Sequence, residues 1–273
     1  MEKLIEIRKI SSIEELTAVQ TLDQTIWKTE AIPVHQTLTV VQNGGLMIGA
    51  FDNGRLVGFS YSFPGLTKGK VYLCSHMLGI HPDYRGQGIG VMLKKAQKNE
   101  AKEIGYTLMT WTYDPLESVN AFLNLSKLKG VANTYIENCY GEMNDGLNDG
   151  LPTDRLKVQW HIQQQPTIRI CTEANQETYK SIANWKINHD GLPVINRSDL
   201  TTVKKEHTIL VPIPKAFQCL KQTDFQLALD WRLQTREFFQ TAFQAKFTAV
   251  HVLKTEDPVY YYVLTKQIEL PAL

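Results

Sequence analysis

The segment that most restricts the fold of this chain is HPDYRGQGIGVMLKKAQ, residues 81–97, which holds three glycines within five residues. It joins an apolar run at 71–80, which predicts a strand, to a run at 89–104 that predicts a helix. A helix that starts at such a turn directs unpaired backbone N–H groups and the positive end of its dipole at one point. Glycines let the backbone approach a ligand without a Cβ in between. The segment therefore predicts an anion site, and we expect the anion to be a pyrophosphate.

Spacing separates the ligand classes that use such loops. The Walker pattern is not met, and the dinucleotide pattern G-x-G-x-x-G fails because its third glycine would fall at Val91. What remains is R-x-x-G-x-G, made by Arg85, Gly88 and Gly90. The alternative for the same residues is a tight turn between strand and helix that binds no ligand.

Composition excludes several classes of protein. The 29 basic and 28 acidic residues nearly cancel, which argues against binding to nucleic acid or to a membrane surface. No apolar run approaches the roughly 18 residues of a membrane span, and the N-terminus lacks the features of an export signal, so we expect a cytoplasmic protein. The four cysteines lie far apart with no CxxC pair, and we expect no metal site.

The 273 residues fit two domains of about 150 residues each. Strands and helices are expected in both halves, which favours an α+β class, and QQQPT at 163–167 reads as a linker. We therefore expect domains at 1–165 and 166–273. In the second domain the patterns predict strands at 167–172 and 207–214, helices at 175–185 and 224–246, and a closing hairpin at 247–266.

The stretch MLGIHPDYRGQGIGVMLKKA, residues 77–96, resembles motif A of the GNAT superfamily of acyl-CoA N-acyltransferases. The resemblance covers about residues 4–162. It implies an N-terminal GNAT fold with a splayed mixed sheet, followed here by a smaller α+β C-terminal domain. It also implies acetyl-CoA, or another acyl-CoA, as the co-substrate.

The resemblance also implies which residues hold the coenzyme. For the pantetheine arm these are Leu78, Gly79 and Ile80, and for the pyrophosphate they are Arg85, Gly86, Gln87, Gly88, Ile89 and Gly90.

His76 lies on the predicted strand, where some relatives place a general base. Histidine titrates near neutral pH, so it could take the proton of the acceptor ammonium. The alternative is a half-buried strand histidine whose nitrogens are hydrogen-bonded.

The chain departs from the family in the helix before Gly130. In SVNAFLNLSKLKG, Leu125 occupies the position of the usual tyrosine acid. Asn120 or Asn124 remain as coenzyme contacts. The proton for the leaving thiolate could come from water or from a tyrosine, with Tyr113 and Tyr135 as the candidates.

We therefore expect an N-acyltransferase that moves an acyl group, by default acetyl, from acyl-CoA to the amine of a small molecule or amino acid. The C-terminal domain is expected to shape the acceptor pocket. The alternatives are a non-catalytic CoA-binding or regulatory module and a succinyl-CoA-dependent amino-acid N-acyltransferase; a protein N-acetyltransferase is a weaker third. The oligomeric state stays open, a homodimer included.

Arg232 and Arg236 lie four residues apart on the predicted long helix of the second domain. We expect a solvated, salt-bridged face. The alternative is a clamp for a carboxylate ligand.

Overall fold

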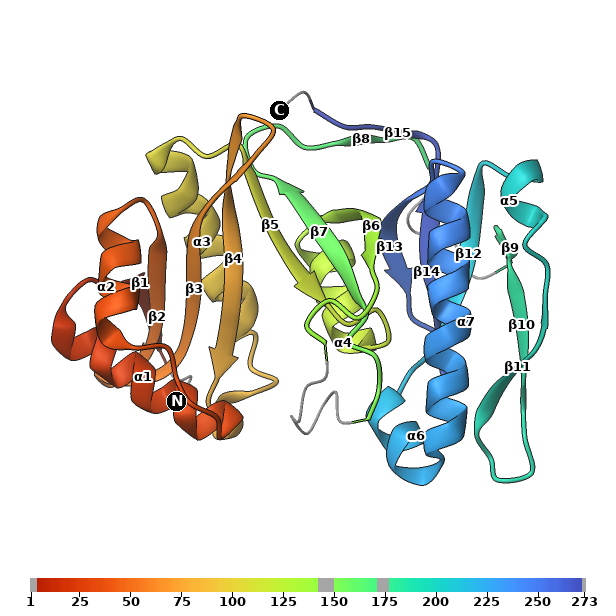
Figure 1. The fold of residues 1–273 in the computed structure, drawn as a ribbon, viewed down its shortest axis with the longest axis horizontal. Helices are drawn as coiled ribbons and strands as arrows, with labels where there is room; N and C mark the ends of the chain where they lie inside the picture. The colour runs from red at the N-terminus through yellow and green to blue at the C-terminus, as the bar shows by residue number, and fades with distance from the viewer. Residues whose placement is uncertain (1–3, 142–149, 171–176, 272–273) are drawn as a thin grey trace. The chain divides into compact units, whose positions relative to one another are not determined.

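The computed structural model describes residues 4–141, 150–170 and 177–271 (Figure 1). They form two compact units. The first unit comprises the chain up to Trp111 together with His161–Gln165, and the second comprises Thr112–Trp160 together with Pro166–Pro271. The predicted boundary between residues 165 and 166 coincides with one of these divisions, and the two predicted domains stay a prediction.

The first unit is built on a mixed sheet in the order β1-β2-β3-β4-β5. Its strands are β1 (Ile5–Lys9), β2 (Leu46–Asp52), β3 (Arg55–Thr67), β4 (Lys70–Ile80) and β5 (Leu108–Tyr113). The first four pair antiparallel, and β4 pairs parallel with β5. An α+β fold with a mixed sheet was predicted and is confirmed.

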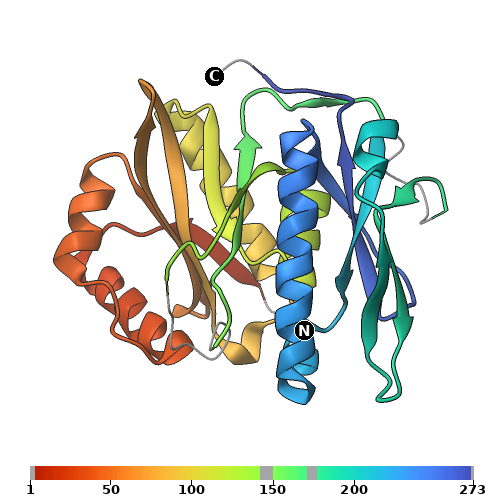
Figure 2. The ribbon, with the colours of Figure 1, turned by 45° about the vertical axis from the view of Figure 1, so that its right-hand side comes forward.

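Helices cover both faces of this sheet (Figures 1 and 2). They are α1 (Ile13–Trp27) and α2 (Val34–Gln42) on one face and α3 (Ile89–Ile104) on the other. Met47 and Phe51 of β2 are in the core on the α1 side, whereas Ile48 and Ala50 of the same strand pack with Leu93 of α3. This alternation is what period-two strands require when both faces are buried.

Local signals explain the element boundaries of the first unit. Ser12 caps α1 by accepting from the Glu15 N–H, and Gly105 ends α3 with φ 104°. In the hairpin between β2 and β3, Asn53 and Gly54 take φ values of 48° and 81°, as a tight two-residue turn demands. The span of α3 was predicted and is confirmed.

The second unit contains a sheet in the order β7-β6-β13-β14-β12-β9, antiparallel except for the parallel pair β12 and β9. Its strands are β6 (Val131–Ile136), β7 (Arg155–His161), β9 (Lys180–Ser181), β12 (Thr208–Pro214), β13 (Thr248–Leu253) and β14 (Val259–Thr265). Two further pairs are β8 (Thr167–Ile168) with β15 (Ile268–Glu269) and β10 (Ala183–Ile187) with β11 (Pro193–Ser198).

The helices of the second unit are α4 (Ser118–Ala121), which continues as the π-helix η2 (Phe122–Lys127), then α5 (Thr202–Lys205), α6 (Phe217–Thr223) and α7 (Phe225–Gln244). The long helix α7 packs against β6, β11 and β12 (Figure 2). The predicted long helix, the strand at 207–214 and the closing hairpin are confirmed.

The predicted helix at 175–185 is wrong in the described part of that segment, from residue 177 on. Lys180 and Ser181 pair with β12, and Ala183 opens a hairpin strand. The Trp185 indole N–H donates to the Tyr261 hydroxyl at 2.7 Å, so its partner lies 76 residues away in the sequence. Tertiary pairing, rather than local periodicity, sets the conformation here.

The expected solvated face of α7 is also wrong at Arg232, whose exposed fraction is 1%. Its guanidinium binds Asp114, and that of Arg236 binds Asp154 at 2.8 and 2.9 Å. The two guanidinium groups do bind carboxylates, as the predicted clamp would, but the carboxylates are side chains of the protein and not a ligand.

No helix among the described residues is long and apolar enough to cross a membrane.

Candidate active site

The glycine-rich loop follows directly on β4. The His81 N–H donates to the Val57 carbonyl at 2.9 Å, which ties the strand end to β3. A short 3-10 helix, η1 (Pro82–Tyr84), comes next, and the Tyr84 hydroxyl donates to Asp52 Oδ2 at 2.7 Å. These contacts hold the loop at the end of the sheet.

Two glycines of the loop have backbone conformations that favour glycine. Gly86 and Gly88 have φ values of 77° and 79°, and a Cβ at either position would meet nothing within 4 Å. Gly88 is the N-cap of α3 and offers no side chain to cap it. The N–H groups of residues 86–90 find no acceptor among the described residues. The loop therefore presents free donors at a helix N-terminus, as the predicted anion site requires.

Arg85, Gln87 and Ile89 are further predicted pyrophosphate residues of the loop. Arg85 is exposed, and its Nε donates to the Ile80 carbonyl at 3.3 Å, which places the guanidinium at the end of β4. Gln87 donates from Nε2 to the Asp83 carbonyl at 3.2 Å. Ile89 is buried in the core, so only its backbone N–H could serve a ligand.

Close packing explains why residue 79 is a glycine. A Cβ there would lie 2.7 Å from Phe59 Cε1 and 2.9 Å from Ile26 Cδ1 of α1. Leu78 is half-buried beside it.

β4 loses its regular pairing on both sides at His76. On the β3 side Ser62 pairs with Ser75 and Tyr61 with Met77, which leaves His76 as the extra residue of a β-bulge. On the β5 side the parallel ladder consists of two residue pairs, and the last one joins Cys74 to Thr110. The two strands therefore separate from Ser75 onward, which agrees with the splayed sheet that the resemblance implied.

The His76 ring projects from the bulge beside two aromatic rings. Its centroid lies 5.6 Å from that of Phe63 and 6.4 Å from that of Tyr61. Burial of part of the ring lowers the pKa of His76, so the imidazole is neutral near pH 7 and can accept a proton. Neither ring nitrogen has a hydrogen-bond partner within the described chain, so the predicted alternative of a hydrogen-bonded strand histidine is not what the structure shows.

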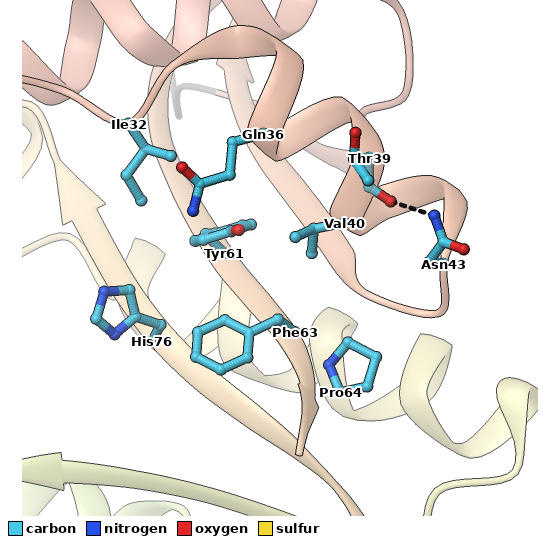
Figure 3. Close-up of a pocket in the computed structure, with 9 residues that line it drawn as sticks. All are labelled: Ile32, Gln36, Thr39, Val40, Asn43, Tyr61, Phe63, Pro64 and His76. Atoms are coloured by element: carbon cyan, nitrogen blue, oxygen red, sulfur yellow. Dashed lines mark hydrogen bonds between the residues drawn. The ribbon is translucent and has the colours of Figure 1, made fainter. Parts of the chain in front are cut away.

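His76 lies at the edge of a pocket of about 580 Å³ between α2, β3 and β4 (Figure 3). The pocket is lined by Ile32, Gln36, Thr39, Val40, Asn43, Tyr61, Phe63, Pro64 and His76. The rings of Tyr61 and Phe63 lie side by side, and the Gln36 amide of α2 points toward Tyr61 (Figure 3). The Asn43 amide, just after α2, donates to the Thr39 carbonyl at 2.7 Å (Figure 3). No Asp, Glu, Lys or Arg is among these residues.

The α2 side of this pocket was missed from the sequence. Gln36, Thr39 and Asn43 recur at intervals of three and four, so they share one helix face. A polar stripe on a short helix that follows Pro33 was the signal that could have found them.

The predicted residues of the helix before Gly130 lie in the second unit. Asn120 is exposed on α4, while Leu125 at the expected acid position is fully buried on η2. Burial raises the pKa of both Tyr113 and Tyr135, with the Asp154 carboxylate adding to the effect at Tyr135, so neither releases a proton readily. A contact of Asn120 with the coenzyme stays a prediction.

Residues 10–124 match the family described as the acetyltransferase (GNAT) family. This part of the chain is a GNAT acetyltransferase domain. The predicted GNAT resemblance is confirmed, and so is the prediction of a GNAT-type acyltransferase enzyme at the level of this domain. No curated protein matches the chain.

Several solved structures are similar to part of the chain. The ribosomal-protein-S18-alanine N-acetyltransferase of Escherichia coli is 15% identical with a TM-score of 0.46, over 59% of this chain and 96% of that one. The putative acetyltransferase yncA of Salmonella typhimurium, solved with acetyl-CoA, is 15% identical with a TM-score of 0.48, over 62% of this chain and 99% of that one. An N-acetyltransferase of Staphylococcus aureus is 17% identical with a TM-score of 0.47, over 59% and 99%. At these similarities the family assignment depends on the match over residues 10–124.

Among the described residues, no group of three His, Cys, Asp or Glu side chains gathers as metal ligands.

Proposed function

We propose that the protein transfers an acyl group from acyl-CoA to the amine of a small molecule or an amino acid, with acetyl-CoA as the default donor. The observation that carries the proposal is the arrangement of three features along β4 of the GNAT domain. These are the donor-rich loop after Ile80, the separation of β4 from β5 after Cys74, and the bulge that places His76 at the edge of a pocket.

The proposed reaction is a direct attack of the amine on the thioester carbon. The C–N bond forms, the C–S bond breaks, and the coenzyme leaves as a thiolate. The amine must be neutral to attack, and the neutral His76 imidazole takes the proton from the acceptor ammonium, directly or through a water. Because a thiol has a pKa of about 8.5, the thiolate can leave without the acid that is missing at Leu125.

The pocket beside His76 supports an acceptor with an apolar or aromatic body. Tyr61 and Phe63 offer ring faces, and Val40 adds an aliphatic contact. Gln36 and Asn43 can orient a polar substituent of the acceptor, but the lining offers no carboxylate for a second ammonium. We therefore expect a monoamine to be preferred over a polyamine.

The cytoplasmic location, the oligomeric state, the coenzyme role of Asn120 and the role of residues 166–273 in acceptor binding stay predictions.

Thiol release from acetyl-CoA in the presence of an amine panel tests the proposed function. The panel contains arylalkyl monoamines, neutral amino acids and polyamines, each measured against the rate of hydrolysis without amine. We expect the arylalkyl monoamines to raise thiol release most. The Phe63→Ala variant should have a higher KM for these amines. If the coenzyme binds but no amine raises thiol release above hydrolysis, the non-catalytic CoA-binding module is the better description.

A further inference from the structure

A buried lysine lies on α3 beneath the point where β4 and β5 separate. Lys94 is 3% exposed, and its Nζ donates to Ser75 Oγ of β4 at 2.7 Å. The same Nζ lies 3.7 Å from the centroid of the Trp111 ring of β5. Ser75 and Trp111 each follow the last β4–β5 residue pair, Cys74 with Thr110. The ammonium therefore contacts both strands at the base of the splay.

Hydrogen-bond donors outnumber acceptors around this lysine. The Ser75 hydroxyl donates to Gln97 Oε1 at 2.7 Å, and Gln97 is fully buried. Gln97 Nε2 is buried without a partner. Nζ has one hydrogen-bond acceptor, Ser75, and no carboxylate lies within ion-pairing distance of it among the described residues. A buried group of donors of this kind favours a ligand that brings oxygen acceptors and negative charge.

The absence of an anionic partner affects the pKa of Lys94. Burial lowers the pKa of Lys94 to about 7, with nearby Cys74 acting in the opposite direction. A carboxylate at Nζ would offset that penalty by pairing with the charged form.

The proposed course of the coenzyme leads its acyl end toward this lysine. With the pyrophosphate at residues 85–90 and the pantetheine arm along 78–80, the thioester lies further back along β4, beside His76. The acyl group extends beyond the thioester, and the next residue back, about 3.3 Å along the strand, is Ser75. Ser75 contacts Lys94 on the α3 face of the sheet, whereas His76 faces the pocket on the α2 side, so the proposed acyl chain reaches Lys94 through the separation of β4 from β5 after Cys74. The terminal carboxylate of a succinyl group lies three carbon–carbon bonds, or about 4 Å, beyond the thioester carbon.

We infer that Lys94, with Gln97 beside it, forms a subsite for the acyl group and selects acyl-CoA donors whose acyl chain ends in a carboxylate. The inference rests on the proposed function, because it uses the course of acyl-CoA along β4. It names the donor class, the CoA thioesters of short dicarboxylic acids, in place of the default acetyl group.

The test compares two donors of equal chain length by calorimetry. Succinyl-CoA and butyryl-CoA differ in that a carboxylate in the first replaces a methyl group in the second. Both are titrated into the wild-type protein, into Lys94→Met and into Lys95→Met. Lys95 is the matched control, since it is the exposed neighbour of Lys94 on α3. We expect the wild type and Lys95→Met to bind succinyl-CoA at least tenfold more tightly than butyryl-CoA, and Lys94→Met to lose this preference.

Equal affinities of the wild type for the two donors would overturn the inference, whatever the variants do. So would a Lys94→Met protein that keeps the preference, or one that loses affinity for both donors and for free CoA alike. Because the readout is binding, it is independent of turnover. A protein that prefers succinyl-CoA but acylates no amine would contradict the proposed function and leave the donor subsite standing.

Discussion

Arg232 of α7 binds Asp114 through both of its Nη atoms, and the two residues lie 118 positions apart in the sequence. Nη1 donates to Oδ1 at 2.8 Å and Nη2 donates to Oδ2. Asp114 follows directly on β5, and Arg155 lies 3.7 Å from the same carboxylate. A bidentate pair with so little exposure holds the long helix in register within the second unit.

Arg232→Met should therefore destabilise the protein strongly. The substitution leaves the Asp114 carboxylate buried with Arg155 as its remaining charged partner, and such a loss costs on the order of 3–5 kcal/mol. Urea unfolding measures it, with Glu237→Met on the exposed side of α7 as the control that stays close to wild type. An Arg232→Met protein within about 1 kcal/mol of the wild type would show that the pair contributes little net stability.

The pairing of Arg232 with Asp114 could not be predicted from the sequence. The spacing of Arg232 and Arg236 placed both on one helix face, but nothing local revealed that their carboxylates lie on distant elements. The opposite holds for the first unit, where Ser12, Asn53-Gly54 and Gly105 fix their elements by bonds within a few residues. Those boundaries could be predicted because their causes are local.

The candidate site divides in the same way. An anion-binding loop at Gly86 and Gly88 could be predicted because a strand, a glycine-rich turn and a helix follow one another in the sequence. The bulge at His76 was not predicted, since register depends on how β3 pairs with β4. Lys94 carried no signal either: a lysine on an amphipathic helix is ordinarily on the solvent side.

Gly88→Ala should weaken CoA binding at least tenfold, about 1.4 kcal/mol, because a methyl group would project into the proposed pyrophosphate site. A Cβ meets no protein atom there, so the fold loses only the strain of a left-handed alanine, about 1–2 kcal/mol. Gly54→Ala is a matched control, since Gly54 has φ 81° and equally open surroundings in the β2–β3 turn. Calorimetry with free CoA should separate the two variants, and equal CoA affinities would remove the loop from the binding site.

His76→Ala should lower kcat/KM for the amine by about 10²-fold, the lower end of general-base effects. The pKa of His76 is lowered by burial, so in the wild type the rate falls as the pH drops through that value, below 6.5. The variant should lose this acidic limb. His35→Ala, a histidine at an exposed position of α2, should keep both the rate and the limb. An acidic limb unchanged in His76→Ala would exclude His76 as the base.

Lys94→Met should stabilise the protein, and the gain should depend on pH in a defined way. The pKa of Lys94 is about 7 in the folded protein, whereas a lysine of an unfolded chain titrates at about 10.4. Between these values the unfolded chain binds the proton and the folded one resists it, so wild-type stability falls as the pH drops from about 10.4 to about 7 and this effect levels off below. The variant lacks the group, and its advantage in unfolding free energy should grow over the same window to on the order of 4–5 kcal/mol, at about 1.4 kcal/mol per pKa unit. Urea unfolding at pH 9.5, 8 and 6.5 measures this for Lys94→Met and for the exposed control Lys95→Met, which should stay level. A difference between Lys94→Met and the wild type that is the same at all three pH values would mean that Lys94 keeps its charge in the fold.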